Sequence, residues 1–528
     1  MKKSHWKTLS FSAVAIMALS ACASEPEENG EGNNAEGESN NLIIGTASDI
    51  TNLDPHLSND VPSSNVQSNI FETLLTQDVD GELHPNLATD WEQTEDNTWE
   101  FQLREDVTFT DGTDFNADAV AATMDRVLDE DIASQRAFLY EMVEEVNIVD
   151  NYTVEFVTEY PFAPLPAHLA HSGGGIISPT AIEEDYAMME EGNEPGSYIG
   201  ENPIGTGMLM LNEWDTGNEV VLDTNEDYWG DVPSFDSATF RVIPEDLTRI
   251  GELQDGNIHI IEPIPSDSMD QIENNENATL VRTESLGLDY IGFNTQKEPF
   301  DDERVRQALS MAINKETIVD GVLNGAGVVA ESPINQNVFG YSENVDGLEY
   351  DPEAAQELLA EAGYEDGFST TLWTNDETTR QNISEVAQQN LAEIGVEVDV
   401  EVREWGSFLD STAQGDHDMF ILGWSTVTSD ADYGMYPLFH SSSVGAPGNR
   451  SFLEDDEVDE VLESARQETD ENTRLELYEE AQNLLVEKAP MVYLDHDEHI
   501  SAHLNSVQGY EMHPNGIYQL QNVSLNNE

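Results

Sequence analysis

The sequence has little of three things: cysteine, basic side chains and long apolar runs. Cys22 is the only cysteine among 528 residues, which excludes a disulfide within one molecule. Lys and Arg number 19 against 107 Asp and Glu, so the formal net charge is −88 at pH 7. This charge excludes nucleic acid and anionic membrane surfaces as partners, because both attract basic surfaces. The one apolar run near the amino terminus is too short for a permanent membrane-spanning helix.

The excess of acid indicates adaptation to concentrated salt. Charges repel one another over about 10 Å in dilute buffer, whereas the screening length falls to about 3 Å in molar salt. We therefore interpret the charge as suited to a saline exterior, which can also be alkaline. The hydrophobic content of 38% is typical of a globular chain. At about 150 residues per domain, the length predicts two to four domains.

The amino terminus predicts a secreted, lipid-anchored protein. A basic start, "MKKSHWK", is followed by the apolar stretch "TLSFSAVAIMALS" and by small residues before Cys22. This stretch resembles the lipobox of bacterial lipoproteins, in which the cysteine is lipidated and becomes the first residue. We expect residues 1–22 to be the signal peptide and the acidic residues 23–41 to be a flexible tether.

After the tether, hydrophobic periodicity and caps predict alternating strands and helices. In the first half, we expect a strand at 41–48, a helix at 66–76, and strands at 98–104 and 152–157. A further helix is expected at 117–128, with Asn116 as its N-cap. In the second half, Asp351 is the expected N-cap and Gly363 the stop of a helix. A helix at 384–395 leads into a strand at 396–402, and a helix at 473–487 leads into a strand at 489–496. This alternation is typical of an α/β fold, and a last strand that returned to the sheet of the first would place both chain ends in one lobe.

Several ordered segments resemble a known family. They include "NPIGTGMLMLNEW", "NEDYWG", "IGFNTQKEPFDDERVRQALSMAINKETIV" and "EWGSFLDSTAQGDHDMFILGW". Together they resemble the solute-binding proteins that deliver peptides, glutathione, nickel complexes and similar solutes to ABC importers, known as the peptide/nickel family or family 5. The resemblance covers nearly all of residues 42–525.

The resemblance implies a two-lobe, periplasmic-binding-protein-like α/β fold of class II with an extra inserted domain. Lobe I would comprise 42–80, 200–293 and 493–528, the inserted domain 81–199, and lobe II 294–492. Hinge crossings around "DYIGFNT" and "MVYLDHD" would let the lobes close on a ligand.

The resemblance also implies the function. "SNDVPSSN" and "TSDADYGMYPLF" look closest to the glutathione-binding branch, so we expect a monomeric, extracellular binding protein for glutathione or short peptides. Its partners would be the ABC permease subunits and, through them, the ATPase; we expect no cofactor and no enzymatic activity. A nickel chelate or other non-peptide solute is an alternative ligand, and a secreted hydrolase is the alternative from another class.

In relatives an aspartate after the Gly-Trp pair meets the ligand's α-amino group, and that role would fall on Asp432 or Asp430. Solvated surface carboxylates are the alternative for both. Trp424, Trp405 and, in the same loop, Tyr433 are expected to flank the ligand, or else to pack in the core. The resemblance further implies that the loop Asn59, Asp60 and Val61 pairs its main chain with the peptide.

Arg136 and Arg380 are the candidates for the ligand's carboxylate, with a surface ion pair as the alternative for each. Metal and catalytic motifs are weak. "HLAH" at 168–171 and "DHDEH" at 495–499 lack the HExxH spacing, and "SGGG" at 172–175 lacks the Lys-Ser/Thr of a phosphate loop. We therefore expect no metal.

Overall fold

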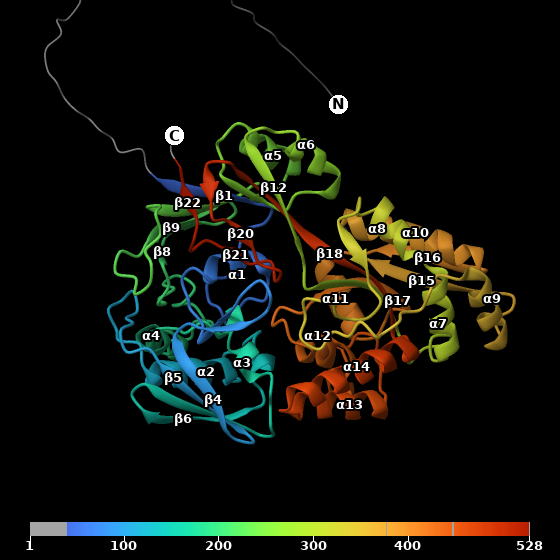
Figure 1. Cartoon of the computed structure of the whole chain (residues 1–528), viewed down its shortest axis with the longest axis horizontal. Helices are drawn as coiled ribbons and strands as arrows, with labels where there is room; N and C mark the ends of the chain where they lie inside the picture. Colours follow the sequence, from blue (N-terminus) through green and yellow to red (C-terminus); the bar gives the residue numbers. More distant parts are fainter. Residues whose placement is uncertain (1–39, 376, 446–447, 527–528) are drawn as a thin grey trace, which may run out of the picture. The chain divides into compact units, whose positions relative to one another are not determined.

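The computed structural model of the chain describes residues 40–375, 377–445 and 448–526 (Figure 1). Cys22 and all of the tether up to residue 39 lie outside the described residues. Asn41, which the sequence analysis placed in the tether, is instead the first residue of β1 (Asn41–Thr46) and pairs with Ser237. Within the described ranges, no helix has both the length and the apolar character needed to cross a membrane.

One long strand, β18 (Met491–Leu504), joins the strands of the two lobes into a twelve-stranded sheet (Figure 1). Its first half pairs with β13 (Gly287–Phe293) and β14 (Gly327–Val329), and its second half pairs with β11 (Ile260–Glu262) and β12 (Ala278–Glu284). On the lobe I side the order continues through β1, β10 (Ser237–Val242), β9 (Glu219–Thr224) and β8 (Leu209–Asp215). On the lobe II side it continues through β17 (Met419–Ser425), β15 (Phe368–Thr374) and β16 (Val396–Val402).

A separate four-stranded antiparallel sheet lies within the range predicted for the inserted domain. It has the order β4 (Ala88–Glu95), β5 (Thr98–Leu103), β7 (Thr153–Thr158) and β6 (Val143–Asp150). Its main helix is α2 (Ala117–Leu128), which Asn116 caps by accepting a hydrogen bond from the N–H of Ala119. Short hairpins are formed by β2 (Leu75–Gln77) with β3 (Leu83–Pro85) and by β20 (Glu511–Met512) with β21 (Tyr518–Gln519). The strands that flank the second hairpin, β19 (Val507–Gln508) and β22 (Ser524–Leu525), pair as a separate two-stranded sheet.

The remaining helices complete the layers around these sheets. On the side of lobe I and the inserted domain they are α1 (Val61–Gln67), α3 (Leu165–His168), α4 (Pro179–Glu190), α5 (Asp246–Gln254) and α6 (Met269–Glu273). In lobe II they are α7 (Glu303–Ala312), α8 (Lys315–Gly321), α9 (Pro352–Glu361), α10 (Thr378–Glu393), α11 (Trp405–Ala413), α12 (Ala431–Phe439), α13 (Asp456–Gln467) and α14 (Glu471–Lys488).

The buried apolar side chains form clusters that mostly follow the predicted ranges. One cluster spans residues 42–260 and 507–523, one spans 74–176 and also includes Tyr433, and two lie within 286–494. Ile177, Ala181, Ile182 and Ile199 pack into the lobe I cluster, although the sequence analysis placed them in the inserted domain. Leu74 and Leu75 pack into the inserted domain although they were placed in lobe I. The cores therefore place the first boundary before Leu74 and the second between Ile176 and Ile177.

One predicted element is wrong. Residues 66–76 do not form a helix; α1 ends at Gln67, and β2 begins at Leu75. The segment between them gives its backbone to another part of the chain, because the carbonyls of Asn69 and Ile70 accept hydrogen bonds from the N–H groups of Leu209 and Gly207. A tertiary contact therefore replaces the local helical pattern.

Candidate ligand-binding site

A cavity of about 220 Å³ lies between segments of lobe I, the inserted domain and lobe II. Six of the ten predicted ligand-binding residues line it, namely Asn59, Asp60, Val61, Arg136, Trp424 and Tyr433. The sequence analysis did not anticipate its other lining residues, which are Ser64, His171, Ser172, Gly423, Ser425, Val427, Asn515 and Ile517. Five far-apart stretches of the chain therefore meet at one cavity.

The lobe I wall is built on the start of α1. Asp60 is its N-cap, since one carboxylate oxygen accepts the N–H of Ser63 at 2.9 Å and the other accepts the hydroxyl of Thr51 at 2.6 Å. Val61 is the first residue of the helix, and 44% of its surface is exposed. The helix cap thus holds the 59–61 loop in place at the cavity wall.

Arg136 is a buried cation without an anionic partner. Its guanidinium donates hydrogen bonds to Asn59 Oδ1 at 2.6 Å and to Ser64 Oγ at 3.2 Å, while its Nε has no partner. No carboxylate oxygen of the described residues lies within 4.0 Å of its charged nitrogens. Burial lowers the pKa of Arg136. Arg126 is also buried, but it is paired with two aspartates. Arg136 has no such carboxylate among the described residues, and an anionic ligand group could supply one.

Two aromatic side chains of lobe II form the facing wall. The rings of Trp424 and Tyr433 stack with their centroids 5.5 Å apart, and Trp424 Nε1 donates to the carbonyl of Tyr433 at 3.0 Å. Phe138 and His171 from the inserted domain pack against Tyr433, with centroids 5.9 and 6.1 Å away. Burial raises the pKa of Tyr433 to about 12, so its phenol stays neutral at ordinary pH. The cavity therefore offers a flat apolar face beside a cation.

The expectation for Asp430 and Asp432 is not met by their geometry. Asp430 caps α12 and receives both ends of the Arg474 guanidinium, at 2.6 and 2.8 Å. Asp432 receives Arg466 in the same two-pronged way, at 3.0 Å for each bond. Neither aspartate lines the 220 Å³ cavity; Asp432 faces a neighbouring cavity of about 450 Å³ on the other side of Tyr433. Both carboxylates are buried, and each is paired with one arginine in this structure.

The pairing of Arg466 with Asp432 and of Arg474 with Asp430 could not be predicted from the sequence, because the partners are far apart along the chain. Arg466 lies at the end of α13 and Arg474 in α14, 34 and 44 residues after their partners. Their apolar neighbours could only have suggested that they are buried. Arg466 also contacts the inserted domain, since its Nη1 donates to the hydroxyl of Tyr160 at 3.2 Å and its carbonyl accepts the N–H of Ala163 at 3.2 Å. The Asp432 ion pair is thus part of the seam between the lobes.

Trp405 and Arg380 lie outside the cavity lining. Trp405 is 42% exposed and stacks on Phe408, and the Arg380 guanidinium carbon lies 5.9 Å from the Trp405 ring centroid. Arg380 Nη2 is 3.7 Å from Asp289 Oδ1. A Cβ at Gly423 would lie 3.2 Å from Arg380 Nη2 and 2.8 Å from Asp289 Oδ1. The Arg380–Asp289 pair therefore sits directly behind Gly423, which does line the cavity.

The histidines of "HLAH" and "DHDEH" have structural partners. A ring nitrogen of His168 lies 2.8 Å from the Leu139 carbonyl, and one of His171 accepts the N–H of Gly173. His496 and His499 contact the carbonyls of Gly287 and Pro514. These contacts fix the imidazoles within the fold.

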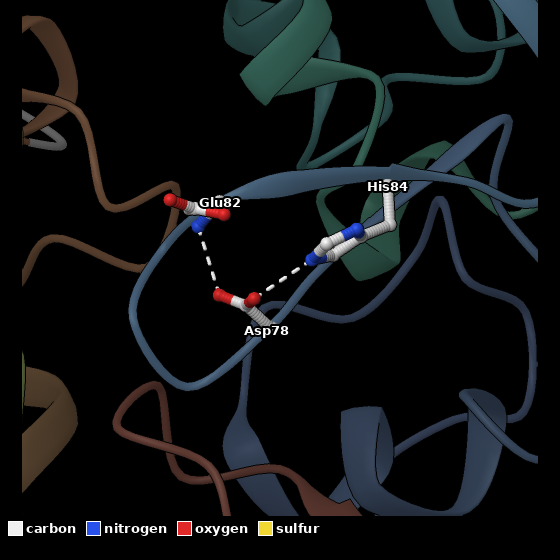
Figure 2. Close-up of side chains that lie close together, drawn as sticks. All are labelled: Asp78, Glu82 and His84. Carbon is white, nitrogen blue, oxygen red and sulfur yellow. Dashed lines mark hydrogen bonds and ion pairs between the residues drawn. The ribbon is translucent and has the colours of Figure 1, made fainter.

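The one group in the described ranges with metal-ligand spacing is Asp78, Glu82 and His84, at the β2–β3 hairpin (Figure 2). Asp78 accepts the N–H groups of Asp80 and Glu82 at 3.0 and 2.9 Å and contacts His84 Nε2 at 2.7 Å. The Asp78 carboxylate therefore serves to hold the hairpin turn. The preceding residue links the lobes, because Gln77 Nε2 donates to the carbonyl of Thr428 at 2.6 Å.

Comparisons with known proteins agree with this architecture. The sequence profile described as "Bacterial extracellular solute-binding proteins, family 5 Middle" matches residues 82–446. The glutathione-binding protein GsiB of Pectobacterium atrosepticum is 32% identical over 492 residues, which are 92% of this chain and 94% of that protein.

Two solved structures resemble nearly the whole chain. The periplasmic binding protein DppA of Helicobacter pylori, in complex with the peptide STSA, is 28% identical with a TM-score of 0.81, over 92% of this chain and 98% of that one. The dipeptide-binding protein of Pseudoalteromonas sp. SM9913, in complex with Met-Leu, is 25% identical with a TM-score of 0.82, over 92% and 100% of the two chains.

Proposed function

The chain belongs to the bacterial extracellular solute-binding proteins of family 5, and we propose that within this family it captures glutathione or a short peptide in the cavity at Arg136. The bound solute would then be delivered to the permease of an ABC importer. The relative at 32% identity is a glutathione-binding protein, and two structural neighbours hold peptides. These resemblances favour a ligand that carries carboxylates and amide groups.

The unpaired guanidinium of Arg136 is the observation that carries the proposal. A buried charge without a counter-charge is costly, and a ligand carboxylate would remove that cost through a charge-assisted hydrogen bond. In a chain with 19 basic residues and a net charge of −88, a buried arginine left without a carboxylate in a cavity is selective for an anionic group. We infer that Arg136, rather than Arg380, meets the ligand carboxylate, because Arg380 lies behind Gly423.

The remaining walls suit the rest of such a ligand. The stacked Trp424 and Tyr433 rings present an apolar face against which a side chain or a peptide plane can pack. The 59–61 loop supplies main-chain groups, so the contact of Val61 would be through its backbone. With Asp430 and Asp432 engaged by arginines, we propose that binding depends on the ligand's carboxylate more than on its ammonium.

We further propose that the mature protein begins at a lipidated Cys22 and acts as a monomer on the outer face of the cell membrane. The proposal rests on the lipobox-like sequence and the acidic stretch after it. Mass spectrometry of the membrane fraction should find Cys22 as an acylated amino terminus. An unmodified Cys22 in a chain that keeps residues 1–21 would contradict the anchor.

Calorimetric titration in molar salt tests the ligand. We expect reduced glutathione or a peptide of two to five residues to release or absorb heat with a 1:1 stoichiometry. The same ligand should raise the melting temperature with concentration, as mass action requires. Absence of binding for glutathione and for every such peptide would contradict the proposal, and nickel retained after purification without chelators would favour a metal chelate.

A further inference from the structure

Two aspartates face each other across the strands that join the lobes. Asp289 of β13 and Asp495 of β18 are register partners, and β18 continues from this pair into the strands of lobe I. The crossing itself is at Ser285 and Asp497, where the Ser285 hydroxyl donates to the Asp497 carboxylate and the Ser285 N–H donates to the Asp497 carbonyl at 3.0 Å. Asp289 and Asp495 therefore lie four and two residues from the crossing at Ser285 and Asp497.

Asp495 is an unsatisfied buried carboxyl group. Its surface is 0% exposed, and neither carboxylate oxygen has a hydrogen-bond partner. An ionised carboxylate in that position would lack both solvation and a counter-charge, which is among the most costly arrangements in a protein. Burial, together with the charges of Asp289 and Asp497, raises the pKa of Asp495 well above its ordinary value.

The surroundings hold more acids than bases. Asp289 comes from β13 and Asp497 from β18 itself. Arg380 comes from α10 and Glu377 is the N-cap of that helix, whereas β14 places Val329 opposite Asp495. Arg380 is 3.7 Å from Asp289, too far for a hydrogen bond. Burial raises the pKa of Asp289 to about 7, with Arg380 opposing and Asp497 and Glu377 adding to the rise. Arg380 is thus one cation among four carboxyl groups, so the cluster has too little positive charge to neutralise them if all four ionise.

The pair is also adjacent to the ligand cavity. Asp289 Oδ1 lies 2.8 Å from the position that a Cβ on Gly423 would take, and Gly423 lines the cavity. The Asp289 side chain is 19% exposed in this structure, and separation of the lobes would bring more water to Gly423 and to Asp289 beside it. Hydration favours the ionised form, so the open protein should hold a proton at this pair less tightly than the closed protein.

We propose that the Asp289–Asp495 pair takes up one proton when the lobes close and releases it when they open, so that closure on a ligand weakens as pH rises. This inference rests on the proposed binding of a solute between the lobes. By linkage, the preference for the closed form is greatest below the pKa of the open form. It falls by up to tenfold per pH unit until the pKa of the closed form is reached, and it is constant above that.

Asp495→Asn tests the proposal, because the amide has the shape of the protonated acid and cannot ionise. Asp399→Asn is the matched control, since Asp399 is exposed on β16. The first measurement is the melting temperature of the ligand-free proteins in molar salt from pH 5.5 to 8.5. The wild type and Asp399→Asn should lose stability as pH rises, whereas Asp495→Asn should lose less, so that the difference widens with pH. Curves that stay parallel would overturn the buried proton.

The second measurement is the radius of gyration by small-angle X-ray scattering over the same range. The wild type should expand as pH rises, while Asp495→Asn should keep the compact value of the wild type at low pH. Equal pH responses, or no response in either protein, would overturn the link to the hinge. Both measurements are made without ligand, so a failure of glutathione to bind would contradict only the proposed function.

A third arm separates a proton from a metal cation. Replacing sodium chloride by choline chloride at constant pH should leave the difference between wild type and Asp495→Asn unchanged. A difference that vanishes without sodium and does not depend on pH would show that a cation, rather than a proton, occupies the pair, and would refute the proposal. If glutathione binds, its Kd for the wild type should rise between pH 5.5 and 7, whereas that of Asp495→Asn should rise less, because only Asp289 can still ionise.

Discussion

At the scale of single residues, the buried charged side chains near the cavity differ in whether they have a partner of opposite charge. Asp430 and Asp432 are held by Arg474 and Arg466, whereas Arg136 has only neutral acceptors. In a chain so rich in acid, a paired aspartate is a structural element, and the buried arginine without a carboxylate is the exception. The distinction cannot be drawn from the residues after the Gly-Trp pair, since their partners lie in distant helices.

Asp432→Asn should destabilise the protein rather than only its ligand complex. The substitution leaves the buried Arg466 without a counter-charge, which costs about 3–5 kcal/mol of unfolding free energy. Replacing both partners, in Asp432→Asn with Arg466→Met, should restore part of that stability, because no buried charge then remains unpaired. Urea unfolding with exposed Asp366→Asn as the control measures the effect. Unchanged stability with lost ligand binding would instead return Asp432 to the role of ammonium partner.

At the scale of elements, caps and periodic helices could be predicted, and close tertiary contacts could not. Asn116 and Asp351 cap their helices as expected, and Gly363 ends α9 with a φ of +95°. These features depend on neighbours along the chain, so the sequence contains the information. The prediction of a helix at 66–76 is wrong because backbone hydrogen bonds with residues 207–209 determine the conformation of this segment. Gly207 permits the two backbones to come this close.

The same limit applies to the site. Asn59, Val61, Arg136 and Trp424, which the family resemblance named as ligand-binding residues, all line one cavity. The resemblance could not place Asn515 or Ile517, which lie in no segment that carries it, nor reveal that the two aspartates pair with arginines. It named the segments that contain Asp289 and Asp495 as hinge crossings, but it could not pair the two aspartates, because their pairing depends on strand register.

The seam between the inserted domain and α13 offers a test at this scale. Tyr160→Phe removes the hydroxyl that accepts from Arg466 Nη1 and should weaken closure by about 1 kcal/mol. Ligand affinity should fall about fivefold, with little change in melting temperature of the ligand-free protein. Tyr152→Phe in the same domain is the control, because its hydroxyl has no hydrogen bond to a described residue. Equal affinities of the two variants would show that this contact does not stabilise the closed form.

At the scale of the whole molecule, the net charge of −88 governs stability more than any single ion pair. Self-repulsion of such a surface is screened within about 3 Å in molar salt but extends over about 10 Å in dilute buffer. We therefore expect the melting temperature to rise steeply between 0.1 M and 2 M sodium chloride. A melting temperature independent of salt would refute the saline interpretation.

The whole molecule also sets the pH response. An aspartate whose pKa is raised by folding costs nothing below its unfolded value of about 3.9, and the cost grows until pH passes the raised value. Asp289 and Asp495 should therefore make the protein less stable at pH 8 than at pH 5.5. Closure and stability would respond to pH through the same pair.

We propose that Arg136 binds the carboxylate of the captured solute. Calorimetric titration of reduced glutathione into wild type, Arg136→Gln and Arg304→Gln, at pH 6 in molar salt, is the decisive measurement. Arg304 is half exposed and pairs with a near neighbour, Asp302, so it controls for the loss of one positive charge. Arg136→Gln should lose about 2 kcal/mol or more of binding free energy, roughly 30-fold in Kd, while Arg304→Gln should bind like the wild type. Wild-type affinity in a folded Arg136→Gln would contradict the claim.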